Sequence, residues 1–429
     1  MIDKEIKNKK DCSGCHACMS ICPKDCITMT QDHEGFLYPK VNYNLCIKCK
    51  KCIDVCPVIN KPKTNEIPQA YACVNKDEDI RLKSSSGGIF TLLADLVLQE
   101  EGAVFGAAFN NQFELEHICI DNSNTYDLDK LRGSKYLQSR IGNAYIEAEN
   151  KLKTGKPVLF TGTPCQIAGL RSYLNKGNRN NDITDKENKE KNESKEKERN
   201  IGNKGNNEKE RNKEGYEEKK EYANLITMDF VCHGVPSPKV WDIYRKFRED
   251  KDQTKTQTVN FRYKIEGWKK FSMFFRFDND SEYTKNLEKD IYLKAFLKDL
   301  CLRPSCYDCK FKGLNRYSDI TLADFWGVAK ELPDMDDDLG TSLVFVNSVN
   351  GQKIFDKIKD DMIYKETNLE SAVKYNPAAI RSAKYNKDRD MFMRQISNIP
   401  FNELTDKYCN ESVLVNFVKR VKGVLKRFF

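Results

Sequence analysis

Two cysteine runs near the start of the chain constrain its fold more than any other feature. They read CSGCHACMSICP, from Cys12 to Pro23, and CIKCKKCIDVCP, from Cys46 to Pro57. Both follow the spacing C-x2-C-x2-C-x3-C-P, in which three cysteines bind one [4Fe-4S] cluster and the fourth binds the other cluster. Each run therefore needs its twin. The spacing predicts two ligand sets: Cys12, Cys15, Cys18 and Cys56 for one cluster, and Cys46, Cys49, Cys52 and Cys22 for the other.

The alternative for these runs is a pair of zinc sites. Zinc ribbons use two CxxC pairs, without the third cysteine and the CP that end each run here, so iron-sulfur clusters are favoured. The prolines end two short helices, and FLYPKV between the runs predicts a strand. Residues 8–60 resemble bacterial two-cluster ferredoxins, which implies a small α+β domain over residues 1–60. Cys26 lies outside the spacing, and we expect it to be a small buried residue with no role.

Composition shifts divide the rest of the chain. The segment PVINKPKTNEIP has three prolines, which predicts a linker at 61–68 that leaves the front domain tethered but separable. A larger domain follows at 69–400. Residues 176–221 have almost no apolar side chains and read as a disordered insertion within it. The last segment, 401–429, predicts a basic amphipathic helix that either packs on the protein or touches an anionic membrane surface.

The larger domain alternates short apolar runs with helical patterns, namely AYACV, IFTLLADLVLQ, AVFGAAF, IGNAYIEAENKLK, PVLFT and NLITMDFV. This alternation predicts an α/β domain with a mostly parallel central sheet. Ligands of such sheets gather at the carboxyl ends of the strands. Three glycine-containing segments follow strands or open helices there: SSSGGIF (84–90), LRGSKYLQS (131–139) and TGTPCQIAGL (161–170). SSSGGIF at a helix start suits a phosphate, although serines and glycines are also ordinary caps.

Charge and cysteine content set limits on location and partners. The 17 cysteines occur without a secretory leader, which favours metal binding in a reducing cytoplasm over disulfides. No apolar run is long enough to span a membrane, so we expect a soluble protein. The net charge of +8 comes from 72 basic residues interleaved with 64 acidic ones, which argues against nucleic acid as a partner.

The later cysteines form a third candidate group. Cys165 lies where a strand meets a helix, a position that lowers a thiol pKa, so it is predicted to be either a nucleophile or a metal ligand. A nucleophile would need a partner such as His233. Cys232 ends another predicted strand, and CLRPSCYDC adds Cys306 and Cys309. Four thiols from distant segments could therefore meet at one edge of the sheet.

The motif series SSSGGIF, RGSKYLQS, GTPCQIAGL, DFVCHGVPSP, RPSCYDCKF and RYSDITLADFWG resembles the family of coenzyme F420 hydrogenase and dehydrogenase beta subunits. The resemblance covers nearly the whole chain apart from the insertion and the last helix. It implies a flavoprotein with an iron-sulfur cluster beside FAD. It maps the cluster onto Cys165, Cys232, Cys306 and Cys309, with Cys301 near enough to replace one of them and a zinc site as the alternative. The implied flavin contacts are Ser86, Gly87, Gly88, Lys135, Gly162 and Thr163.

These features predict an oxidoreductase in which electrons pass between [4Fe-4S] clusters and FAD. The flavin would exchange hydride with coenzyme F420 or another small-molecule substrate, and a ferredoxin or another redox protein would be the partner. One alternative is an electron-relay subunit of a hydrogenase or dehydrogenase complex, with no substrate site. Others are a ferredoxin-dependent reductase associated with polysaccharide biosynthesis and a zinc-bearing assembly factor. No catalytic residue is assigned, and His233 is only a weak candidate.

Overall fold

The computed structural model describes residues 1–175 and 222–410. Two predictions fall outside this range. They are the insertion at 176–221 and the part of the basic helix at 411–429. None of the helices in the described residues is both long and apolar enough to cross a lipid bilayer.

The first 60 residues form a small unit with an internal repeat. Its strands β1 (Ile27–Gln31) and β2 (Leu37–Val41) pair antiparallel, which confirms the strand predicted from FLYPKV. Helices α2 (Ala17–Ser20) and α3 (Lys51–Asp54) each carry the third cysteine of one run. The residue before each helix is left-handed, with φ near 65° and 62°, so each run turns sharply after its second cysteine. The unit also contains α1 (Ile2–Glu5) and η1 (Lys9–Asp11).

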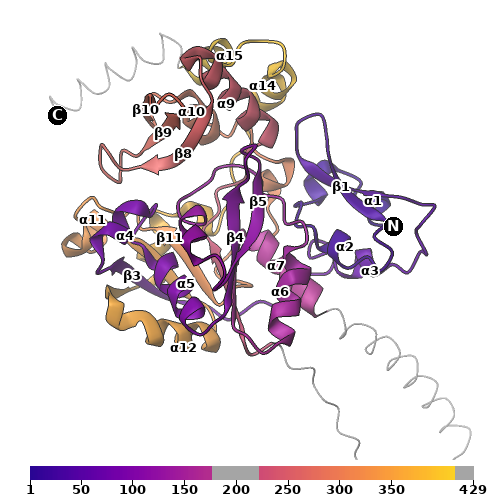
Figure 1. Cartoon of the computed structure of the whole chain (residues 1–429), viewed down its shortest axis with the longest axis horizontal. Coiled ribbons are helices and arrows are strands. Elements are labelled where there is room, and N and C mark those ends of the chain that lie inside the picture. The colour runs from indigo at the N-terminus through magenta and orange to yellow at the C-terminus, as the bar shows by residue number, and fades with distance from the viewer. Residues whose placement is uncertain (176–221, 411–429) are drawn as a thin grey trace, which may run out of the picture.

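The larger unit is built on one mixed sheet of eight strands (Figure 1). The order is β13-β3-β12-β11-β7-β6-β4-β5. The pairings β11-β7, β7-β6 and β6-β4 are parallel, as the sequence predicts for the centre of the sheet. Because β3 is antiparallel to β12, and β12 to β11, five strands run in one direction, while β5, β12 and β13 run in the other. The strand bounds are β3 (Gln69–Asn75), β4 (Ala103–Phe109), β5 (Leu115–Ile120), β6 (Val158–Gly162), β7 (Leu225–Phe230), β11 (Ile320–Asp324), β12 (Ser342–Val346) and β13 (Met362–Thr367).

Helices cover both faces of this sheet because its central strands are apolar on both sides. Leu159 of β6 packs with α5 (Ile89–Gln99) and α12 (Val349–Ile358). The next residue, Phe160, points to the other face and packs with α6 (Ala144–Lys153) and α7 (Pro164–Leu174). The shorter helices lie in the connections: α4 (Glu78–Lys83), η2 (Thr125–Lys130), η3 (Pro304–Asp308), α11 (Val328–Glu331), η4 (Pro333–Met335), η5 (Lys359–Asp361), α13 (Leu369–Lys374) and η6 (Pro377–Ala379).

A third unit, which the sequence patterns did not reveal, has its own aromatic core. An antiparallel sheet of β8 (Thr256–Tyr263), β9 (Ser272–Phe277) and β10 (Glu282–Asn286) packs with four helices. The core includes Trp241 and Tyr244, both essentially inaccessible to solvent. Residues 401–409, the start of the predicted basic amphipathic helix, bury Phe401 and Leu404 in this core, which agrees with the alternative that the helix packs on the protein. The helices are α9 (Pro238–Asp252), α10 (Ile291–Leu297), α14 (Arg389–Gln395) and α15 (Phe401–Cys409).

The front unit is docked on the other two through buried polar contacts, beside α6 and α7 in Figure 1. The fully buried Arg303 donates hydrogen bonds to the carbonyls of Cys12 and Leu37. Arg389 of α14 forms a bidentate ion pair with Glu34, with Nη–Oε distances of 2.6 and 2.8 Å. Ala17 and Cys18 of the front unit also belong to one buried cluster with Phe160 and Ile167 of the larger unit. The prediction of a separable front domain is therefore wrong, because separation would return this apolar surface to water.

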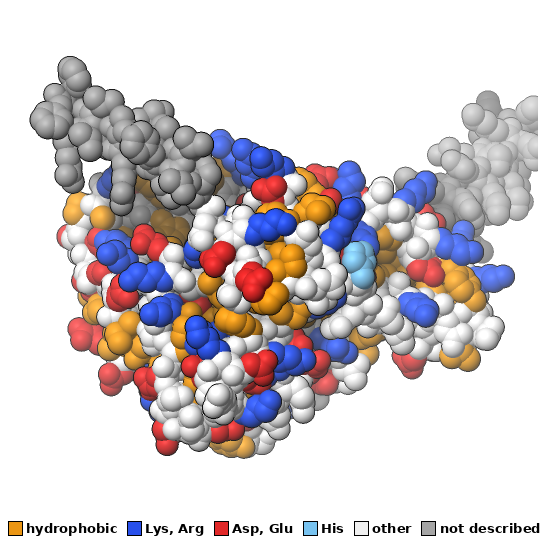
Figure 2. All heavy atoms as spheres, turned by 90° about the horizontal axis from the view of Figure 1, so that it is seen from above, with side chains coloured by type: hydrophobic (Ala, Val, Ile, Leu, Met, Phe, Trp, Pro, Cys, Tyr) orange, Lys and Arg blue, Asp and Glu red, His pale blue; other side chains and the backbone are white. Residues whose placement is uncertain are grey.

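Surface charge is mixed on the face drawn in Figure 2. Basic and acidic side chains alternate there over short distances, and neither sign forms a continuous stripe on this face. This pattern matches the interleaving of the two signs in the sequence.

Candidate functional site

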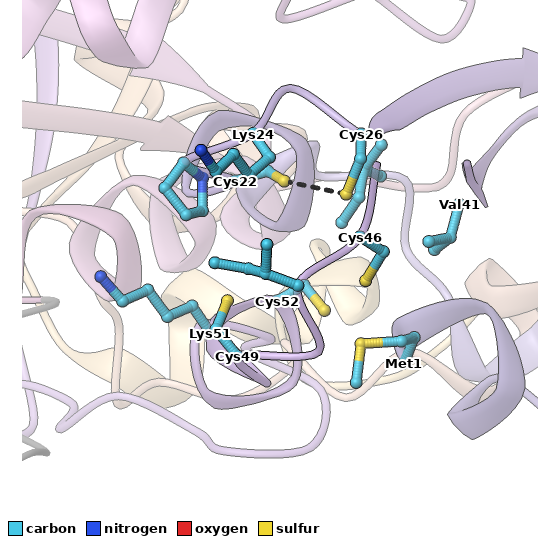
Figure 3. Close-up of a pocket in the computed structure, with 12 residues that line it drawn as sticks. Met1, Cys22, Lys24, Cys26, Val41, Cys46, Cys49, Lys51 and Cys52 are labelled. Atoms are coloured by element: carbon cyan, nitrogen blue, oxygen red, sulfur yellow. Dashed lines mark hydrogen bonds between the residues drawn. The ribbon is translucent and has the colours of Figure 1, made fainter. Parts of the chain in front are cut away.

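The first group of cysteines lines a pocket in the front unit (Figure 3). The pocket walls combine thiols with apolar side chains such as Met1 and Val41. Cys49 is exposed and Cys52 is buried, so the pocket lies close to the surface. The sequence predicts four of the thiols as one ligand set, and the structure adds a fifth: the pocket cysteines are Cys22, Cys46, Cys49, Cys52 and Cys26.

The second group is more enclosed. Cys15 and Cys18 are buried, and Cys18 is carried by α2. Burial raises the pKa of both thiols, and the neighbouring thiols Cys12 and Cys56 raise it further. The four cysteines that the spacing predicts as one set therefore lie within electrostatic range of one another. Such thiols give up their protons only when a cation replaces them, as iron does.

The third group brings together cysteines that are up to 144 positions apart in the sequence. Cys165, Cys232, Cys306 and Cys309 line a single open pocket, together with Ser13 and Val58 of the front unit. Cys165 lies in the first turn of α7, directly after β6, and Cys232 follows β7. Because β6 and β7 are adjacent parallel strands, their carboxyl ends place both thiols at the same edge. The 3-10 helix η3 adds Cys306 and ends at Cys309.

The chemistry of this third group differs from one prediction. Desolvation raises the pKa of the Cys165 thiol to about 12, and it does the same for Cys232 and Cys306. The hydrogen bond between Thr163 Oγ1 and Cys165 Sγ, at 3.0 Å, works in the opposite direction but is outweighed. The expectation of a lowered pKa is therefore wrong for Cys165. Both a nucleophile and a metal ligand need the thiolate. The three other cysteines in the same pocket, and not the pKa, favour a metal ligand.

Two other residues named from the sequence have different surroundings. Cys301 is fully buried in the aromatic core of the third unit, with Cys409 close enough to influence its pKa. It does not line the pocket of the third group, so it is not positioned to replace one of those ligands. His233 does line that pocket, and its Nε2 lies 2.5 Å from Asp299 Oδ1 in an ion-pair geometry.

Helix α7 connects the second and third groups. Gly169, one turn after Cys165, packs directly on the second group: a Cβ on Gly169 would lie 3.2 Å from Cys15 Sγ. Tyr145 holds this contact by donating to the carbonyls of Cys15 and Gln166. The second and third groups are therefore adjacent. Cys52 of the first group in turn lies in electrostatic range of Cys18.

The thiols of the first and third groups line pockets. In residues 1–175 and 222–410, no three His, Cys, Asp or Glu side chains are placed to bind one metal ion. A tetrahedral zinc site needs each sulfur about 2.3 Å from the ion. A four-iron cluster is larger and takes its thiolates from around a cavity. Cysteine thiolates are the ligands of [4Fe-4S] clusters, so the thiols of the two front-unit groups suit such clusters.

Two basic residues at the third pocket were not singled out from the sequence. Lys312 donates hydrogen bonds to the carbonyls of Cys232 and Ala378, and Arg316 lines the same pocket. Both belong to the segment KFKGLNR, which directly follows Cys309. Their closeness to the CxxC pair of Cys306 and Cys309 was the sequence signal that could have identified them. Their positive charges oppose the negative charge that four thiolates would bring.

The predicted flavin contacts lie along the same edge of the sheet as the third group. Gly88 is the N-cap of α5, with φ of 84°, and no side chain caps the first-turn N–H groups. Arg132 donates from Nε to Thr91 Oγ1 in that first turn, and the Ser134 amide donates to Ser85 Oγ. The loops 84–88 and 131–135 therefore meet at an uncapped helix end, which is a suitable place for a phosphate.

The other predicted flavin contacts are already used within the protein. Ser86 Oγ donates to Thr341 O, and the Gly87 amide donates to Ser342 Oγ. Thr163 forms a capping box with Gln166, so the start of α7 beside Gly162 is closed by its own side chains. Lys135 donates to the carbonyls of Lys130 and Arg132, and burial lowers its pKa to about 7. Of the predicted set, Gly88 is the residue whose surroundings best fit an anion.

Comparisons with known proteins agree with this division of the chain. A family model described as 4Fe-4S dicluster domain matches residues 11–60. A second family model describes the C terminus of the beta subunit of coenzyme F420 hydrogenase/dehydrogenase, and it matches residues 155–372, which is half of the chain. This match spans β6, β7 and all four cysteines of the third group.

Individual relatives are distant. The F subunit of the F(420)H(2) dehydrogenase of Methanosarcina mazei is 24% identical over 176 residues, covering 39% of this chain and 49% of the relative. An uncharacterized protein of Methanocaldococcus jannaschii is 25% identical over 208 residues, covering 41% of this chain and 56% of the relative. The chain thus spans about half the length of these curated relatives.

Among solved structures, a chain of the F420-reducing [NiFe] hydrogenase complex from Methanosarcina barkeri matches 81% of this chain and 92% of its own, with 17% identity and a TM-score of 0.40. That likeness is too weak to carry an argument about the site. The family matches carry it instead. With an N-terminal 4Fe-4S dicluster domain followed by the beta-type C-terminal region that supplies the third group of thiols, the chain belongs to the family of coenzyme F420 hydrogenase and dehydrogenase beta subunits.

Proposed function

We propose that this chain is an iron-sulfur flavoprotein that conducts electrons between a redox protein and FAD, with coenzyme F420 or another reducible small molecule as the hydride partner. The observation that carries the proposal is the adjacency of three cysteine groups. The groups run from the surface pocket around Cys49, through the buried Cys15 and Cys18, to the pocket around Cys165.

The proposed ligands are the sets given by spacing and by family resemblance. A bound [4Fe-4S] cluster accepts and releases one electron at a time. The first two clusters would be held by Cys12, Cys15, Cys18 and Cys56, and by Cys46, Cys49, Cys52 and Cys22. The third would be held by Cys165, Cys232, Cys306 and Cys309.

The protein's own residues prepare these sites. Tyr145 fixes the Cys15 loop on α7 and so sets the spacing between the second and third groups. Lys312 and Arg316 place positive charge at the third pocket. The docked front unit supplies one wall of that pocket through Ser13 and Val58, which keeps bulk water away from the thiols on that side.

FAD is proposed on the family resemblance together with the uncapped start of α5. A flavin exchanges hydride with a substrate and single electrons with clusters. Its phosphates would lie against the first-turn N–H groups after Gly88, with Arg132, which contacts Thr91 in that turn and pairs with Asp129, as a cation of the adjoining loop. The proposed domain division is 1–60 for the front unit, 61–68 for the connection and 69–400 for the flavin and third-cluster domain.

The test is anaerobic absorption spectroscopy of the purified protein. Bound flavin that bleaches on addition of reduced F420, NADH, NADPH or reduced ferredoxin supports an oxidoreductase and identifies its donor. A protein that holds flavin but reacts with none of these donors would contradict the proposed substrates. Zinc in place of iron would contradict the proposal as a whole.

A second candidate is an electron-relay subunit without a substrate site. The internal use of the polar groups of Ser86, Gly87 and Thr163 favours it, because these groups are not free to hold a flavin. This candidate predicts three clusters and no flavin in protein purified without loss of iron.

A further inference from the structure

Cys26 is a fifth thiol in a pocket whose proposed cluster takes four. Its Sγ lies 3.3 Å from Cys22 Sγ, and Figure 3 shows the two side chains directed at each other. It also interacts with the Cys46 thiol, so it lies between two proposed ligands. Cys26 is 4% exposed. The sequence spacing gave it no role, and the structure places it among the ligands.

The backbone holds Cys26 in this position from both sides. The Asp25 amide donates to the Cys22 carbonyl at 3.3 Å, and Asp25 is left-handed with φ of 45°, so the chain turns back immediately after Pro23 and Lys24. On the other side, the Cys26 carbonyl accepts from the Asn42 amide at 2.8 Å, just before β1 begins. The contact between the two thiols is therefore built by a turn and a strand and does not depend on a mobile side chain.

The second cysteine run provides an internal comparison. The position four residues after its last cysteine, Cys56, is Asn60, whose amide donates to the Cys56 carbonyl at 2.8 Å. The Asn60 side chain donates to the carbonyls of Ile53 and Asp54, which end α3. The repeat thus carries a helix-ending amide at this position in one half and a thiol in the other.

The pocket that contains Cys26 is more accessible to solvent than the second group of cysteines. Cys49 is exposed and Cys22 and Cys46 are half-buried, whereas Cys15 and Cys18 of the second group are buried. Of the two proposed clusters of the front unit, the one in this pocket is the more open to water and to oxidants, which promote ligand loss.

We propose that Cys26 is a reserve ligand for the cluster held by Cys46, Cys49, Cys52 and Cys22. In the exchange, the bond from iron to Cys22 Sγ breaks and a bond from the same iron to Cys26 Sγ forms. The proton of the Cys26 thiol passes to the released Cys22 sulfur, and no oxidation state changes. The inference rests on the proposed cluster in this pocket.

The experiment compares iron content and electron paramagnetic resonance of four proteins purified anaerobically: wild type, Cys22→Ala, Cys22→Ala/Cys26→Ala and Cys56→Ala. Alanine is used because a serine hydroxyl can itself bind iron. Cys22→Ala should keep the wild-type iron content, because Cys26 replaces the missing ligand. The double variant should lose about four irons. Cys56→Ala is the matched control, with no thiol at the equivalent position, and it should lose a similar amount.

Cys22→Ala losing as much iron as the double variant would overturn the proposal. A wild type with no iron in the front unit would instead overturn the cluster assignment, so the two failures are distinguishable. A second measurement covers the case in which Cys22→Ala does not fold. Cys26→Ala keeps all four primary ligands, and in air its front-unit iron should be lost several-fold faster than in wild type. An equal rate of loss would also overturn the proposal.

Discussion

Docking of the front unit depends on a buried charge pair whose removal should be measurable. Arg389 and Glu34 are 4% and 9% exposed, and the guanidinium binds both carboxylate oxygens. Arg389→Met keeps the length of the side chain but leaves the Glu34 carboxylate buried without its partner. Breaking one side of such a pair costs about 3–5 kcal/mol. At 1.4 kcal/mol per factor of ten, the undocked population should rise by roughly two to three and a half powers of ten.

Amide hydrogen exchange measures that population directly, because local opening exposes amides in proportion to its free energy. Peptides from 32–41 in Arg389→Met should exchange at least a hundredfold faster than in wild type. Peptides from β4 should not change. The double variant Glu34→Gln/Arg389→Met should recover much of the protection, since no unpaired charge remains. As a control, Lys357→Met removes an exposed ion pair with Glu100 and should lower the free energy of unfolding by less than about 1 kcal/mol. Less than tenfold faster exchange in Arg389→Met would refute the reasoning.

Three further predictions concern the third pocket, the flavin and the third unit. Lys312→Met removes a positive charge beside the third cluster, so the midpoint potential of that cluster in a redox titration should fall. The fall should be roughly 60 mV if the charge contributes 1.4 kcal/mol. An unchanged potential would contradict the assigned cluster position. Arg132→Gln should lower the flavin content after gel filtration, whereas Arg276→Gln, on an exposed pair with Glu282, should not. Trp241→Ala should destabilise the third unit by about 3–5 kcal/mol in thermal unfolding, because Trp241 is 1% exposed, and Trp326→Ala, at 38% exposed, should have a smaller effect.

Local signals in the sequence predict the elements that surround the cysteines well. The segment IFTLLADLVLQ forms α5 with the predicted bounds, and AVFGAAF forms β4. Both have a strong apolar period and clear boundaries. The sequence places Cys165 and Cys232 after two strands that it predicts to be parallel, so both thiols should lie at the same edge of the sheet. The parallel pairing of β6 with β7 confirms this prediction. The antiparallel strands β5, β12 and β13 were missed, and so was β11, which is parallel to β7.

Long-range contacts account for the other differences. Glu34 and Arg389 are 355 positions apart, and no local pattern shows that they pair. Arg303 reads as an ordinary charged residue in CLRPSCYDC, yet it is fully buried between units. The thiol pKa of Cys165 was predicted from the position at a helix start, but burial in a pocket walled by the front and larger units raises that pKa. The third unit was missed because β8, β9 and β10 were absorbed into one long domain.

The most direct test of the three-cluster account is the count of iron and acid-labile sulfide in anaerobically purified protein, with zinc measured in the same sample. The account predicts about twelve irons and about twelve sulfides per chain, falling by about four of each in Cys309→Ala while the signals of the front clusters remain. About eight irons in wild type, with one zinc and no change in iron on Cys309→Ala, would contradict it.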